Sequence, residues 1–191
     1  MNYFYKIFSE IYEMAAEKMC LHCKGFIKED SKILDLGCGS GIIGKNFQKY
    51  FKGDLIGVDI KDQRTVNIPF QIYNGISLPF SENCFDVVLI NYVLHHCQNP
   101  SIIIEEAKRV AKDKIIIFED LAEGTLAKLI CKIHGISFDF LFQKNKETGN
   151  FKKGNEWGKI FENSGLKLVF EKRVSSICDP VKKKLFILEK I

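Results

Sequence analysis

The chain lacks long apolar runs, is poor in proline and has no stretch of biased composition. Its 191 residues include 4 prolines and 14 glycines, while 46% are hydrophobic and 27% are charged. This balance excludes fibrous and disordered chains and is typical of a globular protein. A helix that crosses a bilayer needs about 18 or more consecutive apolar residues, so we expect no membrane partner. The length suits one domain, which we expect to cover residues 1–191.

Signals for secretion and for metal binding are also missing. The N-terminus has no basic segment followed by an apolar core and a small-residue cleavage site. The 7 cysteines are an odd number and are scattered along the chain, which favours reduced thiols over a disulfide framework. Only Cys20–Cys23 has the spacing of metal ligands, and no second Cys-x-x-Cys pair completes a zinc site. We therefore expect a cytoplasmic protein without a metal ion.

The chain carries little excess charge. Its formal net charge is +4, and basic clusters such as Lys182–Lys184 are typical of solvated turns. Nucleic acid is therefore not the partner that the composition favours, although the charge does not exclude it. The sequence does not specify an oligomeric state.

Short apolar runs alternate with helical patterns through much of the chain. Helices are predicted at 41–51 and 100–112. This alternation favours an α/β fold with a doubly wound, mostly parallel sheet and right-handed crossovers. The connection Lys61–Ile68 leaves room for two helical turns at most. Buried strands are predicted at Lys32–Leu36, Leu55–Asp59, Phe70–Tyr73, Phe85–Asn91 and Lys114–Glu119.

The two ends of the chain follow other patterns. A helix over residues 3–24 is predicted within an N-terminal helical cap of residues 1–28. Near the C-terminus, a helix at Asn155–Ser164 precedes strands at Leu166–Val174 and Lys184–Glu189. The loop between these strands is too short for a parallel crossover, so we expect a seven-stranded sheet with an antiparallel last strand. The apolar stripe of the N-terminal helix is predicted to consist of Phe4, Phe8, Ile11, Tyr12, Ala15 and Met19.

Residues 121–153 are predicted to form an insertion after the fifth strand. They combine an apolar helical run, Leu126–Ile133, with an aromatic stretch and a polar tract, Gln143–Asn150. The aromatic residues Phe138, Phe140 and Phe142 are candidates for the lining of an apolar pocket, although such residues also build cores.

Three glycines at every second position follow the first predicted strand. Residues 33–36 lead into Gly37, Gly39 and Gly41, and a predicted helix follows. Glycine removes side chains where a ligand must approach the backbone. In an open parallel sheet, nucleotide cofactors bind at the carboxyl ends of the strands. The loop is therefore predicted to bind a cofactor of this kind.

Two cofactor types compete for this loop. Residues Gly39–Gly44 satisfy the G-x-G-x-x-G pattern of a nicotinamide dinucleotide site, with Asp59 about 20 residues further on. However, Asp35 stands before Gly37, at the lip of the loop, where a carboxylate would repel a pyrophosphate. The G-x-G-x-x-G match also begins two residues after Gly37. A negative charge suits S-adenosylmethionine, which carries an ammonium and a sulfonium and no phosphate.

Four motifs follow one another in a fixed order. They are Asp35-x-Gly37-x-Gly39-x-Gly41, Gly57-Val58-Asp59-Ile60, Tyr73–Phe80, and Phe85–Asn91 with Leu94-His95-His96. Together they resemble the class I methyltransferases that use S-adenosyl-L-methionine, in particular the group called methyltransferase type 11. The resemblance is close over residues 30–120 and extends by the order of elements to the end of the chain.

The resemblance implies how the first two motifs bind the cofactor. Gly37, Cys38, Gly39 and Gly41 would let its methionine part approach the backbone. Asp35 would hold its amino group, directly or through water. Asp59 would accept hydrogen bonds from both ribose hydroxyls, since a carboxylate offers two oxygens.

The resemblance also implies roles for later residues. Ile60 would lie against the adenine face, and Asn74 and Gly75 would border the adenine edge, where the family usually has an Asp and a small residue. Asn91 would line the floor beneath the sulfonium. One of the two following histidines would face the substrate, and His96 is the candidate catalytic residue because histidine titrates near neutrality.

The methyl acceptor is expected to be a small molecule. The segment Asn91–Leu94 lacks the prolines of the Asn-Pro-Pro-Tyr motif that resembles amino-nucleobase methyltransferases, and no Pro-Cys pair is present for attack on a pyrimidine ring. An RNA or protein methyltransferase and a non-catalytic S-adenosylmethionine-binding protein are the alternatives, and a nicotinamide oxidoreductase is a third.

Overall fold

The structure is a computed structural model that describes residues 9–142, 150–175 and 179–191, with the backbone alone over residues 134–142. Phe4, Phe8 and residues 143–149 lie outside the described residues, as do the side chains of the three phenylalanines of the aromatic stretch. In chain order the elements are α2 (Ser9–Cys23), β1 (Lys32–Leu36), α3 (Ile42–Phe51), β2 (Asp54–Asp59), β3 (Phe70–Ile72), β4 (Phe85–Asn91), η1 (Leu94–His96), α4 (Pro100–Val110), β5 (Ala111–Leu121), α5 (Thr125–Phe142), α6 (Gly154–Asn163), β6 (Leu166–Arg173) and β7 (Lys182–Lys190).

The described strands form one mixed sheet of seven, which confirms the predicted fold class. Its order is β3-β2-β1-β4-β5-β7-β6. β2 pairs in parallel with β1 and with β3, whereas β6 and β7 pair antiparallel. The order of strands reverses between β1 and β4, and α/β sheets bind ligands at such a switch point.

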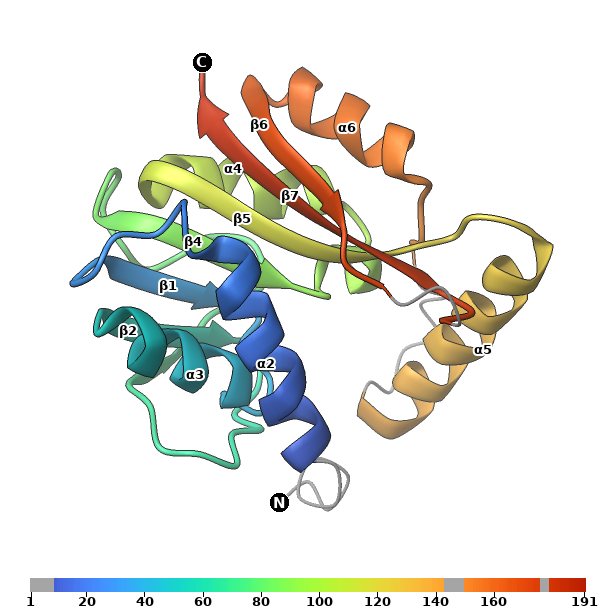
Figure 1. The fold of residues 1–191 in the computed structure, drawn as a ribbon, viewed down its shortest axis with the longest axis horizontal. Coiled ribbons are helices and arrows are strands. Elements are labelled where there is room, and N and C mark those ends of the chain that lie inside the picture. Colours follow the sequence, from blue (N-terminus) through green and yellow to red (C-terminus); the bar gives the residue numbers. More distant parts are fainter. Residues whose placement is uncertain (1–8, 143–149, 176–178) are drawn as a thin grey trace. The chain divides into compact units, whose positions relative to one another are not determined.

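The chain divides into two compact units. The first contains the residues up to Leu89 and the segment Arg109–Lys114, and the second contains Ile90–Lys108 and Ile115–Ile191. Figure 1 shows the helices and strands, coloured along the sequence. The first unit therefore includes α2, α3 and β1 to β3, and the second includes α5, α6, β6 and β7.

Buried apolar strands form the core of the first unit. Ile33, Leu34 and Leu36 in β1 are 0% exposed. Asp35 pairs with Gly57 across β1 and β2, and the next pair of strands places Asp59 opposite the last residue of β3. The three strands therefore end at one edge, because parallel strands in this register finish at similar levels.

Helix α2 packs against α3 with a different face from the predicted one. Ile11 is 58% exposed and Ala15 is also exposed, so this part of the predicted stripe is wrong. Small side chains allow two helices to approach closely, which favours a face rich in alanine and cysteine over one with large apolar residues. The buried residues are Ala16, Met19, Cys20 and Cys23.

In the connection between β2 and β3, which the structure describes throughout, no helix forms. The Arg64 guanidinium instead pairs with Asp62 at 2.8 Å and donates to the carbonyl oxygen of Ile68 at 2.6 Å. The N–H of Thr65 donates to the carbonyl oxygen of Ser40 at 2.9 Å. The connection therefore lies against the glycine loop.

An aromatic cluster forms the core of the second unit. Helix α6 packs on β6 and buries Trp157 and Phe161, which are 0% and 1% exposed. The ring of Phe161 lies 5.2 Å from that of Phe186 in β7. β6, at the edge of the sheet, is mostly exposed and carries charged residues, which protect an edge strand from pairing with other chains.

The two ends of the segment predicted as an insertion lie side by side within the second unit. Leu121 forms a parallel bridge with Lys152, and the N–H of Ala122 donates to the carbonyl oxygen of Lys152 at 3.1 Å. Helix α5, between these points, is longer than the predicted apolar run because it continues to Phe142. Backbone pairing of Leu121 and Ala122 with Lys152 therefore joins the two ends of this segment.

Within the described ranges, no helix combines the length and apolarity that a bilayer crossing requires. The same residues contain no group of three or more His, Cys, Asp or Glu side chains placed to hold a metal ion. Burial raises the pKa of Cys20 in α2 to about 12. This thiol therefore stays protonated at neutral pH.

We expect Phe161→Ala to lower the free energy of unfolding by about 3 kcal/mol or more, because it leaves a cavity between Trp157 and Phe186. Chemical denaturation monitored by tryptophan fluorescence measures the loss. The control is Val169→Ala on β6, where the side chain is 37% exposed, and its effect should be below about 1 kcal/mol. Equal losses in the two variants would contradict the assigned core.

Candidate functional site

Hydrogen bonds tie the glycine loop to the end of β2. The N–H groups of Gly37 and Cys38 donate to the carbonyl oxygen of Val58, at 2.8 and 3.1 Å. The N–H of Gly39 donates to Oδ2 of Asp59 at 2.9 Å. The loop therefore crosses the carboxyl end of β2, and the structure brings together the two motifs that the sequence predicts as a site.

The path of the loop requires glycine at all three predicted positions. Gly37, Gly39 and Gly41 have φ angles of 76°, 50° and 77°, which residues with a Cβ rarely adopt. A Cβ on Gly41 would also lie 3.1 Å from the side chains of Val66 and Ile68. The connection after β2 therefore fills the space where a side chain at position 41 would lie.

Both carboxylate oxygens of Asp59 accept backbone hydrogen bonds. In addition to the Gly39 bond, Oδ1 accepts the N–H of Ile60 at 2.7 Å. Burial raises the pKa of Asp59, although these hydrogen bonds act in the opposite direction. The N–H of Lys61 is a third backbone donor to this carboxylate, so three of its four lone pairs are used. Asp59 can therefore accept a further hydrogen bond from a ligand hydroxyl.

Asp35 is buried in the first unit and does not lie on the exposed lip of the loop. It is 1% exposed, and a Cβ on Gly44 would lie 2.5 Å from its Oδ2. Gly44 is the third glycine of the G-x-G-x-x-G pattern, and here it makes room for a carboxylate. This role of Gly44 was not predicted from the sequence, although the third glycine of the G-x-G-x-x-G pattern marks a position where a side chain would not fit.

Cys38 is close enough to both acids of the site for their charges to act on its thiol. It is 8% exposed, and its Sγ lies 2.8 Å from the position of a Cβ on Gly57. Burial raises the pKa of this thiol, and the carboxylates of Asp35 and Asp59 raise it further. The thiol is therefore neutral, and Gly57 is required to accommodate it.

The predicted segment Tyr73–Phe80 lies next to Ile60, which directly follows β2. Ile60 is 45% exposed, and its Cγ2 lies 3.2 Å from the position of a Cβ on Gly75, which has a φ of 76°. Oδ1 of Asn74 accepts the N–H groups of Ile76 and Ser77 at 2.9 and 2.8 Å. Asn74 therefore uses its oxygen to stabilise the turn, and its amide nitrogen is the group that can donate to a ligand.

The second unit contains the predicted residues at the end of β4. Asn91 is 8% exposed, and its contact with a cofactor stays a prediction. Tyr92 follows with a φ of 59°, and its N–H donates to the carbonyl oxygen of Phe118 at 2.8 Å. A non-glycine residue in this region is strained, and such strain often marks functional sites.

His95 belongs to a buried ion pair. Its Nδ1 lies 2.6 Å from Oε2 of Glu119, and the two side chains are 1% and 0% exposed. Oε1 of Glu119 accepts the N–H of Leu94 at 2.7 Å. Burial lowers the pKa of His95, but the Glu119 carboxylate raises it by more, so the net direction is upward. His95 therefore has a structural role as the buried partner of Glu119, which sequence reasoning did not distinguish from a catalytic one.

His96 is the more accessible of the two histidines. It is half-buried, and its ring lies 4.1 Å from that of His95. Phe151 stacks on the ring of His95 at 4.4 Å with an interplanar angle of 20°. The buried ion pair therefore positions both His96 and Phe151, and the catalytic role of His96 stays a prediction.

Comparison with known proteins shows which family model part of the chain matches. Residues 34–118 match the family model of a methyltransferase domain. An uncharacterized methyltransferase of Schizosaccharomyces pombe is 34% identical over 106 residues, which are 46% of this chain and 38% of that protein, so the chain spans less than half of its length. A demethylmenaquinone methyltransferase of Staphylococcus aureus is 25% identical over 168 residues, which are 73% of this chain and 69% of that protein. The solved structure of the PH0226 protein from Pyrococcus horikoshii superposes over 100% of both chains with a TM-score of 0.74 and 18% identity, which shows the fold alone.

We expect Glu119→Gln to lower the pKa of His95, because burial then acts without the opposing carboxylate. NMR titration of the imidazole C–H signals measures this pKa. The native pair raises the pKa in the folded state, so its stabilisation is present below the unfolded value of about 6.5 and is lost as pH rises through the folded value. The stability difference between native chain and variant should therefore shrink with rising pH.

The matched control for this variant is Glu123→Gln. Glu123 pairs with Arg173 at the surface of the same unit, at 2.8 Å, and its replacement should leave the pKa of His95 unchanged. If His95 titrates alike in the Glu119 variant and the native chain, the ion pair does not exist in solution.

Proposed function

We propose that the chain, whose residues 34–118 match the model of a methyltransferase domain, transfers a methyl group from S-adenosylmethionine to a small-molecule acceptor. The observation that carries the proposal is the contact of the glycine loop with Asp59. It joins a loop with glycine at three positions to a carboxylate that can accept a hydrogen bond from a ligand hydroxyl. S-adenosylmethionine combines a methionine part with a ribose and so requires both features.

The residues of the first unit fit the cofactor. Asp59 would accept hydrogen bonds from the ribose, and Ile60 with Gly75 would contact the adenine. The backbone from Gly37 to Gly41, including Cys38, would border the methionine part. When bound, the cofactor supplies a methyl group that its sulfonium has already activated, so the main task of the chain is to position the acceptor.

The buried carboxylate of Asp35 supports this cofactor over a dinucleotide. It is packed against Gly44, where α3 begins, and a helix N-terminus is where a dinucleotide places its pyrophosphate. Two phosphate charges beside a buried carboxylate would be repelled. The ammonium of S-adenosylmethionine would instead be attracted by the same charge, directly or through water.

A small molecule is the acceptor class that we favour. The Staphylococcus aureus relative, which aligns over 73% of this chain, is by its name a methyltransferase of demethylmenaquinone. The mild net charge of +4 does not favour a nucleic-acid substrate. An RNA or protein acceptor and a binding protein without transfer activity are the alternatives that experiment must separate.

Two measurements test the proposal. Thermal unfolding should shift upward with S-adenosylmethionine and S-adenosylhomocysteine and stay unchanged with NAD, because a ligand stabilises the state that it binds. Stabilisation by NAD alone would overturn the cofactor assignment. Transfer of labelled methyl groups to metabolite, RNA and protein fractions would then identify the acceptor class, and no transfer to any fraction would indicate a binding protein.

We expect Asp59→Ala to weaken S-adenosylmethionine binding by at least about tenfold, because the ribose hydroxyls lose a charged acceptor. Isothermal titration calorimetry measures the dissociation constant. The control is Asp54→Ala, at the exposed start of the same strand, which should bind the cofactor like the native chain. An unchanged dissociation constant in the Asp59 variant would remove this residue from the site.

We propose His96 as the residue that faces the acceptor. His96→Ala should lower kcat by at least about tenfold while leaving cofactor affinity within about twofold, because a positioned base acts on the acceptor and not on the cofactor. Steady-state kinetics with the acceptor from the labelling experiment measure both effects. His22→Ala, on α2 of the first unit, is the control, and native turnover in the His96 variant would assign that residue to packing.

A further inference from the structure

Arg64 joins the start of the connection between β2 and β3 to its end. Its Nε and one terminal nitrogen donate to the two carboxylate oxygens of Asp62, at 2.9 and 2.8 Å. The other terminal nitrogen donates to the carbonyl oxygen of Ile68 at 2.6 Å. The guanidinium also lies over the ring of Phe70, with 4.3 Å between its central carbon and the ring centroid. One side chain therefore holds together both ends of a segment that is neither helix nor strand.

The contacts of Arg64 differ from those of an ordinary surface ion pair. An exposed pair with a single contact contributes little to stability, whereas a planar guanidinium that bonds both oxygens of a carboxylate has a fixed geometry. The side chain of Arg64 is 24% exposed. Its hydrogen bonds lower the pKa of Asp62 to about 2, so the pair is ionised at neutral pH. The bridge made by Arg64 is therefore a defined part of the first unit.

The connection supports the second half of the glycine loop, Ser40 and Gly41. The N–H of Thr65 donates to the carbonyl oxygen of Ser40 at 2.9 Å. The side chains of Val66 and Ile68 each lie 3.1 Å from the position of a Cβ on Gly41, and Ile68 is buried. The connection therefore holds this half of the loop both by a backbone hydrogen bond and by packing.

The first half of the loop, residues 37–39, has a separate support. Its N–H groups donate to Val58 and Asp59 at the end of β2. The Arg64 bridge takes no part in these bonds. Removal of Arg64 should therefore loosen the loop near Gly41, directly before α3, while the first half stays in place.

We propose that Arg64 is a positioning residue of the cofactor site. It fixes the connection, and the connection fixes Ser40 and Gly41 in the shape that binds the methionine part of S-adenosylmethionine. This inference rests on the proposed function, because it assigns a further residue to the same site. A loop that is ordered before binding does not lose conformational freedom when the ligand arrives. Arg64 therefore contributes to affinity through the loop and not as a ligand contact.

An arginine near the loop can also act through its charge alone. Burial raises the pKa of the Cys38 thiol, and the positive charge of Arg64 opposes this shift, so the guanidinium is close enough to act on the loop. Asp62 raises the same pKa, and its charge offsets that of Arg64. Lysine separates the two roles, because it keeps the positive charge but lacks the planar fork that makes the bridge.

Arg64→Ala and Arg64→Lys test the proposal in the full chain. In the alanine variant, S-adenosylhomocysteine should bind at least about tenfold more weakly, because the loop must become ordered during binding. Adenosine lacks the methionine part, so its dissociation constant should stay within about twofold of the native value. The lysine variant should still bind S-adenosylhomocysteine at least about fivefold more weakly than the native chain. Isothermal titration calorimetry and ligand-observed NMR measure these constants.

Three results of these titrations would overturn the proposal. They are native S-adenosylhomocysteine affinity in the alanine variant, equal losses for the two ligands, and full recovery of affinity by lysine. Equal losses would mean that Arg64 supports the whole site and not the second half of the loop. Full recovery would mean that its charge acts without the bridge.

Amide hydrogen exchange tests the same step without a ligand. In cofactor-free Arg64→Ala, the N–H of Thr65 should exchange at least about tenfold faster than in the native chain, because its bond to Ser40 opens more often. The N–H of Gly37, which donates to Val58, should exchange at the native rate. Unchanged exchange at Thr65 would overturn the proposal, and so would faster exchange of both amides, which would indicate a general loss of stability.

The matched control removes an arginine from an ion pair of the second unit. Arg173 pairs with Glu123 at 2.8 Å, so Arg173→Ala breaks a contact of the same kind. This variant should bind S-adenosylhomocysteine and adenosine like the native chain. A loss equal to that of Arg64→Ala would show that the effect is not specific to the bridge.

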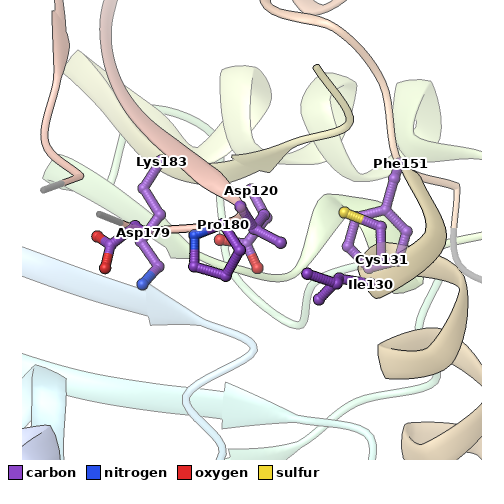
Figure 2. Close-up of a pocket in the computed structure, with 8 residues that line it drawn as sticks. Asp120, Ile130, Cys131, Phe151, Asp179, Pro180 and Lys183 are labelled. Carbon is purple, nitrogen blue, oxygen red and sulfur yellow. The ribbon is translucent and has the colours of Figure 1, made fainter. Parts of the chain in front are cut away.

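Asp59→Ala shows where adenosine binds. It should weaken adenosine and S-adenosylhomocysteine alike, because both contain the ribose. The control is needed because the second unit contains a cavity of about 170 Å³, whose lining includes Asp120, Asp179 and Lys183 (Figure 2). Adenosine binding that Asp59→Ala leaves unchanged would lie outside the cofactor site and would overturn the expected difference between the two ligands.

This inference and the proposed function fail separately. If the native chain binds neither S-adenosylmethionine nor S-adenosylhomocysteine, the proposed function is contradicted, while the exchange of Thr65 still reports whether Arg64 holds the loop. Native binding of S-adenosylhomocysteine that Arg64→Ala does not weaken would contradict only the role of Arg64.

Discussion

The hydrogen bond from the N–H of Gly39 to the carboxylate of Asp59 is the interaction on which the first unit's site depends. It exists because β1 and β2 run parallel in a register that ends both strands at one edge. It requires positive φ angles in the loop, which glycine adopts without strain. Together with the N–H groups of Ile60 and Lys61, it fixes the orientation of the carboxylate, which can still accept a hydrogen bond from a ligand.

Close packing explains the other glycines of this region. Gly44 makes room for the carboxylate of Asp35, and Gly57 makes room for Cys38. The local sequence therefore satisfies a dinucleotide pattern for a reason unrelated to pyrophosphate. A glycine indicates only that a side chain would not fit at its position. It does not indicate which group occupies that space. In this unit the neighbours are a carboxylate and a thiol of the protein itself.

In the second unit, charged side chains on β5 and η1 lie in an apolar interior, where their partners determine their roles. The Glu119 carboxylate pairs with His95 and also accepts the N–H of Leu94, so both of its oxygens have protein partners. The next residue, Asp120, is half-buried, and its buried Oδ1 has no hydrogen-bond partner among the described residues. Adjacent carboxylates on one strand thus differ in their surroundings, because successive side chains of a strand point to opposite faces.

By itself, the sequence determined the strands and the fold class, and it predicted the three segments of the first unit that we propose as the cofactor site. Short apolar runs and glycine spacing are local signals, and parallel pairing then brings strand ends to one edge. Only the tertiary structure decided which face of α2 is buried, that Asp35 lies inside the unit, and that His95 pairs with Glu119. Those features depend on residues distant along the chain: α2 packs on α3, Gly44 meets Asp35 across a turn, and Glu119 lies 24 residues from His95. No local pattern contains such contacts, because burial and pairing arise only when separate segments pack.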